Sequence, residues 1–394
     1  MANQLSIPPP YIKQKNMLKI AFKMLFHSRK KFIGMVIGAT FSAFILMQQP
    51  GIYQGVTDRL VAQIHSIQEI DLWIMDKKSS TFDQPTHFNA MDIYRVKSVP
   101  GVLWAVQLYR MWYPLKHLKT EKTMGWEMLG VDPARLIGLP TQLTAGYRDT
   151  IHHSNALIID GYSLNQYETR SKKTIQLNDI MDGGGRHWTV TGITKPLRTY
   201  SYEPKVYIAS NHIQNVGDYS SFILVKVNPS SNIQRVAHDI QKLTHYDALT
   251  PGQFSKRSMA FFQQHTPIII NFISVAVLGF IIGLIMMWQI FSNFILTHVH
   301  QFGMLKMLGV SNAMLIKMVS SQAAMTGGLG YMIGLILTIL FGLASYDTII
   351  AFHLTWQIAA IGALGTLINV ALSSYFAILK VLRLDTIDLC RDTN

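Results

Sequence analysis

The residues of this chain that could carry out chemistry are few, and their spacing fits none of the common catalytic patterns. His152 and His153 are adjacent, but neighbouring residues of a strand point to opposite faces, and no cysteine or carboxylate set surrounds them at ligand spacing. We interpret the pair as part of a solvated loop, with metal binding as the alternative. The sequence contains neither H-E-x-x-H nor G-x-S-x-G. We therefore expect no catalytic residue and no metal site in this chain.

The glycine cluster Gly183-Gly184-Gly185 comes nearest to a phosphate-binding loop. It precedes the strand-like stretch RHWTV, and no Lys-Ser or Lys-Thr pair follows it. A flexible hairpin turn is the expected structure, and phosphate binding is the alternative. The motif G-x-x-x-x-G-K-[ST] does not occur. We expect the chain to hold no cofactor and to hydrolyse no ATP by itself.

One short segment is too regularly patterned to be a spacer. The stretch THVHQFGMLKMLGVSNAML, from Thr297 to Leu315, carries apolar residues at helical spacing and is punctuated by Gly303 and Gly309. Such a helix is too short to cross a membrane. Its exposed apolar face needs a partner, which is either a layer of lipid headgroups or a groove on another protein. The pattern alone leaves both partners open.

Long apolar stretches identify the chain as a membrane protein. Of its 394 residues, 49% are hydrophobic and only 14% are charged. Four stretches approach or exceed the ~20 residues that cross a hydrocarbon core, and they are expected to be helices because backbone groups in lipid must bond internally. The predicted spans are residues 32–49, 266–296, 313–344 and 349–380. A signal peptide is the alternative for the first span, but no small-x-small cleavage pattern follows it.

The distribution of charge predicts the orientation. The net charge is +13, and the N-terminal 31 residues are basic without a single acidic residue, whereas residues 51–265 hold 23 basic and 18 acidic residues. A basic flank marks the cytoplasmic side. We therefore predict that both termini and residues 297–312 are cytoplasmic and that residues 50–265 lie outside. No aromatic-basic array accompanies the charge, which argues against nucleic-acid binding.

The region between the first two spans has the composition of an α+β domain. Five stretches rich in β-branched and aromatic residues are predicted strands: residues 69–76, 155–161, 187–193, 204–209 and 221–227. Two amphipathic helices are predicted at 89–102 and 232–245, the second capped by Ser231 or Asn232. Helical patterning at 52–65 and 253–265 indicates stalk helices. The predicted fold class is a membrane α-helical protein with four transmembrane helices and a large α+β extracytoplasmic domain inserted between the first and second.

Further one-sided patterns occur at the N-terminus and in the spans. Within residues 1–31, Ala21 and Leu25 share an apolar face opposite lysines, which predicts a helix in the plane of the inner membrane surface; a plain extension of the first span is the alternative. Gln322 and Asn369 are expected to form hydrogen bonds between helices, and the absence of carboxylates from the spans argues against an ion-coupled carrier. Four glycines of the third span are predicted to pack helices closely: Gly327, Gly328, Gly330 and Gly334.

The order of these parts resembles the permease subunits of the MacB/FtsX type (type VII) of ATP-binding-cassette systems, over essentially the whole chain. The most specific likeness is the inner loop, where the family has a stretch like R-E-F-G-x-L-K-A-L-G-A-S and this chain has HQFGMLKMLGVS. Gln301 stands where the family usually has Glu, and His300 where it often has Arg, so we expect contact there to rest more on packing than on charge. The matching residues are Phe302, Gly303, Leu305, Lys306, Leu308, Gly309 and Ser311.

Other stretches point to one branch of this family. The tail RLDTIDLCR, residues 383–391, is similar to the family's closing R-x-D-P-x-x-A-L-R, with Thr386 in place of the proline. The first-span sequence ATFSAFILMQQPGIYQGV, the stretch DLWIM and the motif Val131-Asp132-Pro133 resemble the DevC-like exporter permeases.

This resemblance implies a concrete assembly. A homodimer of permeases in a bacterial inner membrane would be driven by a separate cytoplasmic ATPase, which binds the ATP and Mg²⁺, and ATP-driven closure would move the outer domain (mechanotransmission). DevC-like members work with a periplasmic membrane-fusion (HlyD-like) adaptor and an outer-membrane channel. An FtsX-like role in activating a cell-wall hydrolase and a Lol-like role in lipoprotein release are the alternatives. The coupling helix that docks on the ATPase would comprise His300, Gln301, Phe302, Gly303, Met304, Leu305, Lys306, Met307, Leu308 and Gly309.

Overall fold

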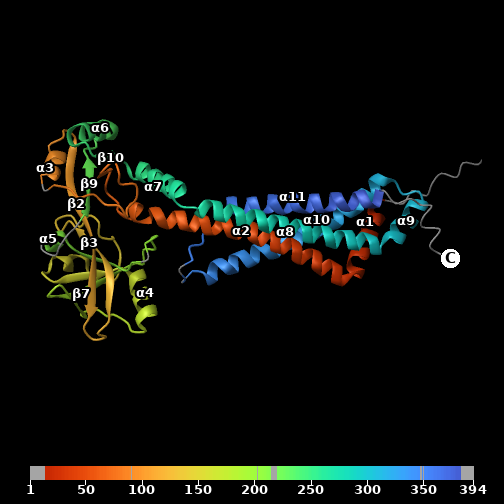
Figure 1. Cartoon of the computed structure of the whole chain (residues 1–394), viewed down its shortest axis with the longest axis horizontal. Coiled ribbons are helices and arrows are strands. Elements are labelled where there is room, and N and C mark those ends of the chain that lie inside the picture. The colour runs from red at the N-terminus through yellow and green to blue at the C-terminus, as the bar shows by residue number, and fades with distance from the viewer. Residues whose placement is uncertain are drawn as a thin grey trace, which may run out of the picture. The chain divides into compact units, whose positions relative to one another are not determined.

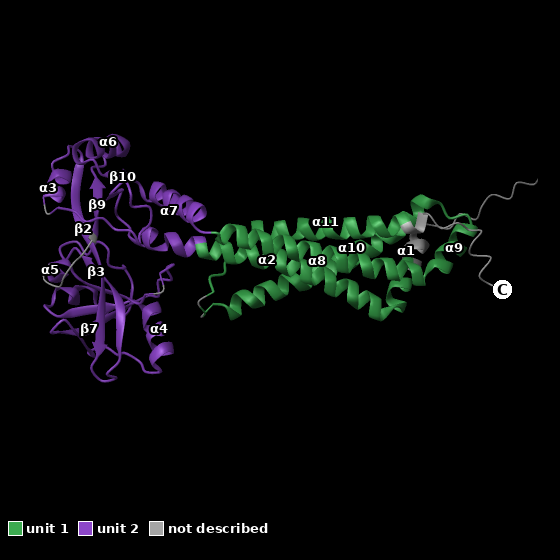
Figure 2. Ribbon diagram, viewed as in Figure 1, with its two compact units in different colours: residues 1–56, 267–394 green, residues 57–266 purple. Residues whose placement is uncertain are grey.

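The computed structural model describes residues 14–89, 91–201, 203–213, 220–346, 348 and 350–382. The chain forms two compact units, one made of residues 1–56 and 267–394 and the other of residues 57–266 (Figure 2). We call them the membrane unit and the inserted unit. The tail at 383–391, which carries part of the family resemblance, lies outside the described residues.

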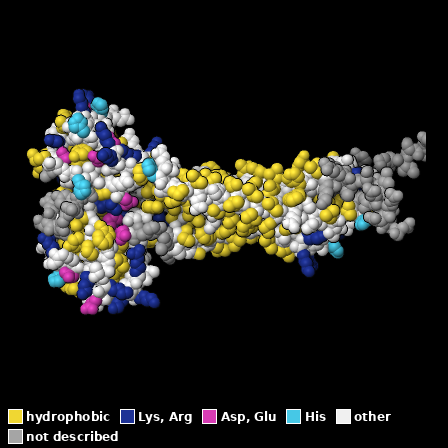
Figure 3. Space-filling model, in the orientation of Figure 1, with side chains coloured by type: hydrophobic (Ala, Val, Ile, Leu, Met, Phe, Trp, Pro, Cys, Tyr) yellow, Lys and Arg dark blue, Asp and Glu magenta, His cyan; other side chains and the backbone are white. Residues whose placement is uncertain are grey.

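Within the described residues, four helices are long and apolar enough to cross a membrane. They overlap the four predicted spans, and Figure 1 shows them running alongside one another. Hydrophobic side chains cover most of the surface of the membrane unit in the view of Figure 3, whereas charged side chains gather on the inserted unit. These helices are α2 (Arg29–Ser66), α8 (Ile268–Thr297), α10 (Asn312–Ala344) and α11 (Trp356–Leu382).

Small residues bring α10 close to both α2 and α11. A Cβ atom on Gly330 would lie 2.3 Å from the Cβ of Ala39 on α2, and one on Gly334 would lie 2.8 Å from the Cβ of Ala43. Gly327 faces Val370 on α11 in the same way, at 2.5 Å. Gly328 differs, because no neighbouring atom lies within 4 Å of its added Cβ. Three of the four predicted packing glycines therefore face a neighbouring helix, and Gly328 does not.

Buried amides tie the helices together, as the sequence predicts. The Asn369 Nδ2 atom on α11 donates to Ser42 Oγ on α2, at 2.9 Å, and to the Phe280 carbonyl on α8, at 3.1 Å. The Gln322 Nε2 atom on α10 donates to the carbonyl of Ala21, at 2.7 Å. Both amides fix a helix partner inside an otherwise apolar bundle.

A helix precedes the first span, as expected: α1 (Gln14–His27). Its Ala21, Met24 and Leu25 are buried in the same apolar cluster as residues of α9 and α10. Phe26 is 48% exposed. Part of the apolar face that the sequence assigns to lipid is thus covered by protein, and the in-plane placement of α1 stays a prediction.

The inserted unit is built on one ten-stranded mixed sheet, in the order β10-β1-β9-β2-β3-β8-β5-β7-β4, with β6 pairing with β2 and β7. Its longest strand, β2, forms an antiparallel pair with β3 in which Tyr109 lies opposite Gly130. The strands are β1 (Leu72–Met75), β2 (Val102–His117), β3 (Thr123–Val131), β4 (Leu143–Gly146), β5 (Ala156–Ile159), β6 (Ile180–Gly183), β7 (Arg186–Thr194), β8 (Lys205–Ala209), β9 (Ser220–Val227) and β10 (Asp247–Leu249).

Short helices accompany this sheet. The predicted cap is confirmed at Asn232, whose side chain accepts from the backbone N–H groups of Gln234 and Arg235. The predicted fold class, four transmembrane helices with a mixed α and β domain between the first and second, is confirmed. The helices are α3 (Asp92–Lys97), η1 (Arg148–His152), α4 (Gly161–Ser171), α5 (Ser210–Ile213), α6 (Ile233–Thr244) and α7 (Pro251–His265).

Candidate functional site

The patterned inner segment forms a short helix between α8 and α10. This helix is α9 (Val299–Met307), and it follows α8 after a turn at His298. It ends where Gly309 adopts a left-handed backbone, with φ of +80°, a conformation that glycine takes without steric cost. The N–H groups of Gly309 and Val310 then donate back to the carbonyls of Lys306 and Leu305, a pattern that closes a helix end.

The structure divides the ten residues of the predicted coupling helix by exposure. Met304, Met307 and Leu308 are 52%, 57% and 64% exposed. His300, Gln301 and Gly309 are also exposed, while Leu305 and Lys306 are partly covered. These residues offer a partner an apolar surface at the end of the membrane unit.

Phe302 and Gly303 require a correction. Both are buried, and the Phe302 side chain, 1% exposed, packs in one cluster with Ala21 and Leu25 of α1 and Leu315 of α10. A side chain held inside this cluster is not available to a partner. Phe302 therefore supports α9 from inside the cluster, and only the exposed residues around it could be reached by a partner.

Polar contacts fix the corner between α8 and α9. The His298 Nδ1 atom lies 2.8 Å from the Phe294 carbonyl, which can only accept, so this nitrogen donates. The other ring nitrogen, Nε2, pairs with Ser28 Oγ at 3.2 Å. The Lys31 ammonium donates to the Thr297 hydroxyl. The α8–α9 corner is thereby joined to Ser28, between α1 and α2, and to the first turn of α2.

An apolar groove lies between α1 and α9. Its volume is about 520 Å³. Met24 and His298 are buried, Leu305 is partly covered, and the other lining residues are exposed. We call it the α1–α9 groove, and it is lined by Lys23, Met24, His27, His298, Gln301, Met304, Leu305 and Leu308.

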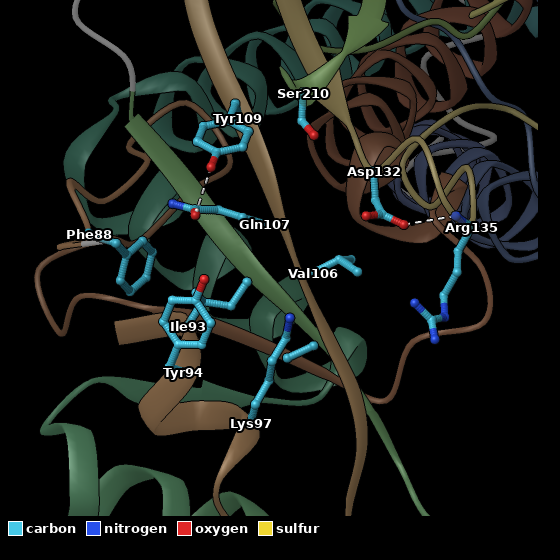
Figure 4. A pocket seen from close by; sticks show the side chains of 11 residues that line it. Phe88, Ile93, Tyr94, Lys97, Val106, Gln107, Tyr109, Asp132, Arg135 and Ser210 are labelled. Atoms are coloured by element: carbon cyan, nitrogen blue, oxygen red, sulfur yellow. Dashed lines mark hydrogen bonds between the residues drawn. The ribbon is translucent and has the colours of Figure 1, made fainter. Parts of the chain in front are cut away.

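A second cavity, of about 340 Å³, opens on the inserted unit (Figure 4). Tyr94 and Lys97 of α3 line it on one side, and Arg135 lies on the other side of β2. Gln107 projects from β2 and accepts a hydrogen bond from the Tyr109 hydroxyl at 3.0 Å. Asp132, from the Val131-Asp132-Pro133 motif, accepts a hydrogen bond from the Arg135 backbone N–H at 2.8 Å through one carboxylate oxygen. The cavity has a polar lining with two exposed cations.

Buried charges connect the end of α2 to the sheet within the inserted unit. Glu127 on β3 accepts from Arg110 Nε on β2, at 2.5 Å, and its second oxygen lies 3.5 Å from Lys205 Nζ on β8. The same ammonium donates to Gln63 Oε1 on α2, at 3.0 Å. Burial by itself would raise the pKa of the Glu127 carboxyl, but Lys205 and Arg110 outweigh it and lower that pKa.

The glycine cluster and the histidine pair, which are the sequence candidates for phosphate and metal binding, lie in a turn and at the end of a short helix. Gly184 and Gly185 both have positive φ, at +58° and +76°, and form the two-residue turn between paired Gly183 and Arg186. The hairpin predicted at this cluster is confirmed. His152 ends the short helix η1. Among the described residues, no three His, Cys, Asp or Glu side chains gather closely enough to hold a metal ion.

Comparison with known proteins identifies part of the chain. Residues 273–386 match the family described as "FtsX-like permease C-terminal", a range that includes α9, α10, α11 and most of α8. No curated protein matches the sequence significantly.

Two solved structures are similar to part of the chain. The extracellular domain of the noncanonic ABC-type transporter YknZ from Gram-positive bacteria is 18% identical, with a TM-score of 0.34, and the match covers 46% of this chain and 99% of that domain. The periplasmic region of MacB from Actinobacillus actinomycetemcomitans is 11% identical, with a TM-score of 0.37, and the match covers 49% of this chain and 94% of that region.

The family match covers the segment HQFGMLKMLGVS, on which the likeness to the family chiefly rests. Placement in the DevC-like branch stays a prediction. Residues 273–386 are thus similar to the C-terminal domain of FtsX-like permeases, and the resemblance of the chain to ABC permease subunits of the MacB/FtsX type is confirmed.

Proposed function

We propose that a separate cytoplasmic ATPase binds the exposed face of α9 and that this chain converts the movement of that ATPase into movement of the inserted unit. The observation that carries the proposal is the exposure of Met304, Met307 and Leu308 on a short helix between two spans of an FtsX-like domain. Full burial of a side chain of this size contributes about 1.5–3 kcal/mol. A partner that covers all three therefore gains a substantial share of its binding energy there.

The route of the movement follows the polar contacts. The pair between His298 and Ser28, together with the hydrogen bond from Lys31 to Thr297, ties the α8–α9 corner to the start of α2. Helix α2 is continuous over 38 residues, from Arg29 to Ser66. Its Gln63 accepts a hydrogen bond from Lys205 of β8 in the sheet. A displacement of α9 would thus be passed along one helix to a buried contact with β8.

The orientation in this proposal places α9 and both termini in the cytoplasm of a bacterium and the inserted unit outside its inner membrane. The basic N-terminus, with no acidic residue before Asp58, supports it. ATP and Mg²⁺ bind to the partner ATPase. The purified chain alone is accordingly expected to hydrolyse no ATP, and hydrolysis that persists without any ATPase subunit would contradict the proposal.

The assembly in this proposal is a homodimer that works with a periplasmic membrane-fusion adaptor and an outer-membrane channel in export. Co-purification from the native membrane distinguishes this role from its alternatives. Recovery of an adaptor supports export. Recovery of a cell-wall hydrolase indicates an FtsX-like signalling role, and recovery of a lipoprotein chaperone indicates Lol-like release.

The docking test compares two methionines of similar exposure. Met307→Asp places a charge on the proposed contact face, and Met91→Asp does the same at a methionine of the inserted unit that is 61% exposed. We expect Met307→Asp to weaken ATPase binding at least tenfold, because a carboxylate cannot be buried there without a partner. Met91→Asp should bind as the wild type does. Equal ATPase recovery with both variants would overturn docking through α9.

A further inference from the structure

The α1–α9 groove is a preformed hollow rather than a flat surface. Its α1 side carries Lys23, Met24 and His27, and its α9 side carries Gln301, Met304 and Leu308. The two helices that form the groove are packed against each other, because Phe302 of α9 and Ala21 and Leu25 of α1 share one buried cluster. The amide of Gln322 also anchors α1 through the Ala21 carbonyl. A ligand can therefore enter without first ordering the helices.

The charge around this groove has one sign. The sequence contains no Asp or Glu in residues 1–57 and none in residues 267–346. Lys23 and His27 are exposed at the edge of the groove. No carboxylate of the described membrane unit is therefore available to Lys23. The groove combines apolar walls with a basic edge.

We propose that this groove receives an apolar side chain of the ATPase, and that a neighbouring carboxylate of the ATPase pairs with Lys23. This proposal rests on the proposed docking of an ATPase on α9. The shape favours a protein segment, because apolar side chains seat in grooves between helices. Anionic headgroups are attracted to a basic surface without needing a hollow. The docking surface thus extends from α9 onto α1, a helix outside residues 273–386, which match the family.

Charge reversal tests the basic edge. The double variant Lys23→Glu/His27→Glu changes two groove residues, and Lys30→Glu reverses an exposed lysine that does not line the groove. Binding of the purified ATPase is measured on the full chain in nanodiscs of neutral phosphatidylcholine, at several salt concentrations. We expect the double variant to associate about tenfold more slowly and with a flatter salt dependence, since charges at the rim of an interface act mainly on the association rate. Lys30→Glu should change this rate less than twofold.

The outcomes separate the groove from docking itself. If Met307→Asp abolishes binding while Lys23→Glu/His27→Glu binds as the wild type does, the groove proposal is overturned and docking through α9 stands. If neither variant changes binding, both are overturned. If the double variant differs from the wild type only in anionic vesicles and not in neutral nanodiscs, lipid rather than the ATPase occupies the groove, and the proposal fails.

Carbodiimide cross-linking identifies the occupant directly. The reagent joins an amine to a carboxylate that touches it, so the wild-type complex should give a peptide linking Lys23 to an Asp or Glu of the ATPase. Lys23→Arg keeps the charge and should lose this product while retaining affinity. Cross-links from Lys23 to the chain's own tail, at Asp385 or Asp388, in place of the ATPase would overturn the proposal.

Discussion

Replacing Glu127 by glutamine is expected to destabilise the inserted unit by about 3 kcal/mol. The substitution keeps the shape of the side chain but removes a carboxylate that lies 3.5 Å from the ammonium of Lys205, whose side chain is 3% exposed. Loss of one partner from a buried ion pair costs about 3–5 kcal/mol, because the remaining charge stays buried. We take the lower end, since Arg110 is 19% exposed and keeps an ion pair with Asp83 at 3.0 Å.

The assay is thermal unfolding of the full chain in detergent, followed by tryptophan fluorescence. Trp126 precedes Glu127 in β3 and is buried in the core of the inserted unit. For a unit of this size, 1 kcal/mol shifts the midpoint by about 2–4 °C, so we expect a loss of about 6–12 °C. Asp83→Asn is the matched control: its side chain is 40% exposed, and such pairs contribute about 0–1 kcal/mol. If Glu127→Gln unfolds within 2 °C of Asp83→Asn, the buried network does not stabilise the unit as we argue.

Three further outcomes are expected. The pKa of Glu127 is lowered in the folded state. Its contribution to the stability of the inserted unit is therefore complete above the unfolded pKa of about 4.3 and is lost as the pH falls through the folded pKa. The difference in unfolding midpoint between the wild type and Glu127→Gln should shrink below about pH 4, and a constant difference would contradict this sign. Gly330→Ala should destabilise the membrane unit by about 1–3 kcal/mol, whereas Gly328→Ala, with open space around its Cβ, should leave detergent unfolding unchanged; equal effects would refute the packing argument. Asp160→Ala removes the side-chain cap of α4 together with a buried acceptor, so the inserted unit should lose about 2–4 kcal/mol by the same fluorescence assay, and a loss below 1 kcal/mol would show that water replaces the carboxylate.

The spans and the buried strands could be predicted because their physical requirements leave a direct mark on the sequence. Each of the four helices needs a long apolar stretch, and the predicted strands at 155–161 and 204–209 contain the buried strands β5 and β8. These strands are buried on both faces and are rich in Val, Ile and Leu, which is typical of a sheet interior.

The longest hairpin of the sheet was not predicted, for an equally physical reason. Strand β2 contains Arg110 and Pro114, and β3 contains Gly125 and Glu127, which all interrupt the usual strand pattern. The presence of each of these residues in a strand is explained by its partner in the neighbouring strand. Arg110 pairs with Glu127, and Pro114 lies opposite Gly125. The pattern therefore becomes interpretable only after the strands are paired.

The inner helix was predicted from its sequence, but its contact face was not. Apolar residues occur all around α9, so helical spacing does not say which of them face the protein. Burial of Phe302 depends on α1, whose Ala21 and Leu25 come much earlier in the chain and pack in the same cluster. Only the tertiary structure separates Phe302, which supports the helix, from Met304 and Met307, which are exposed.

This division also bears on how an ATPase would be held. Helix α9 contains no acidic residue, so it and the following Leu308 offer a partner chiefly apolar contact through Met304, Met307 and Leu308. Apolar contact supplies affinity but little orientation, because it is non-directional. A charged contact does orient a partner, and Lys23 on α1 lies at the edge of the same groove. In our proposal the two tasks therefore fall to different helices: α9 supplies most of the binding energy, and α1 sets the register in which the partner docks.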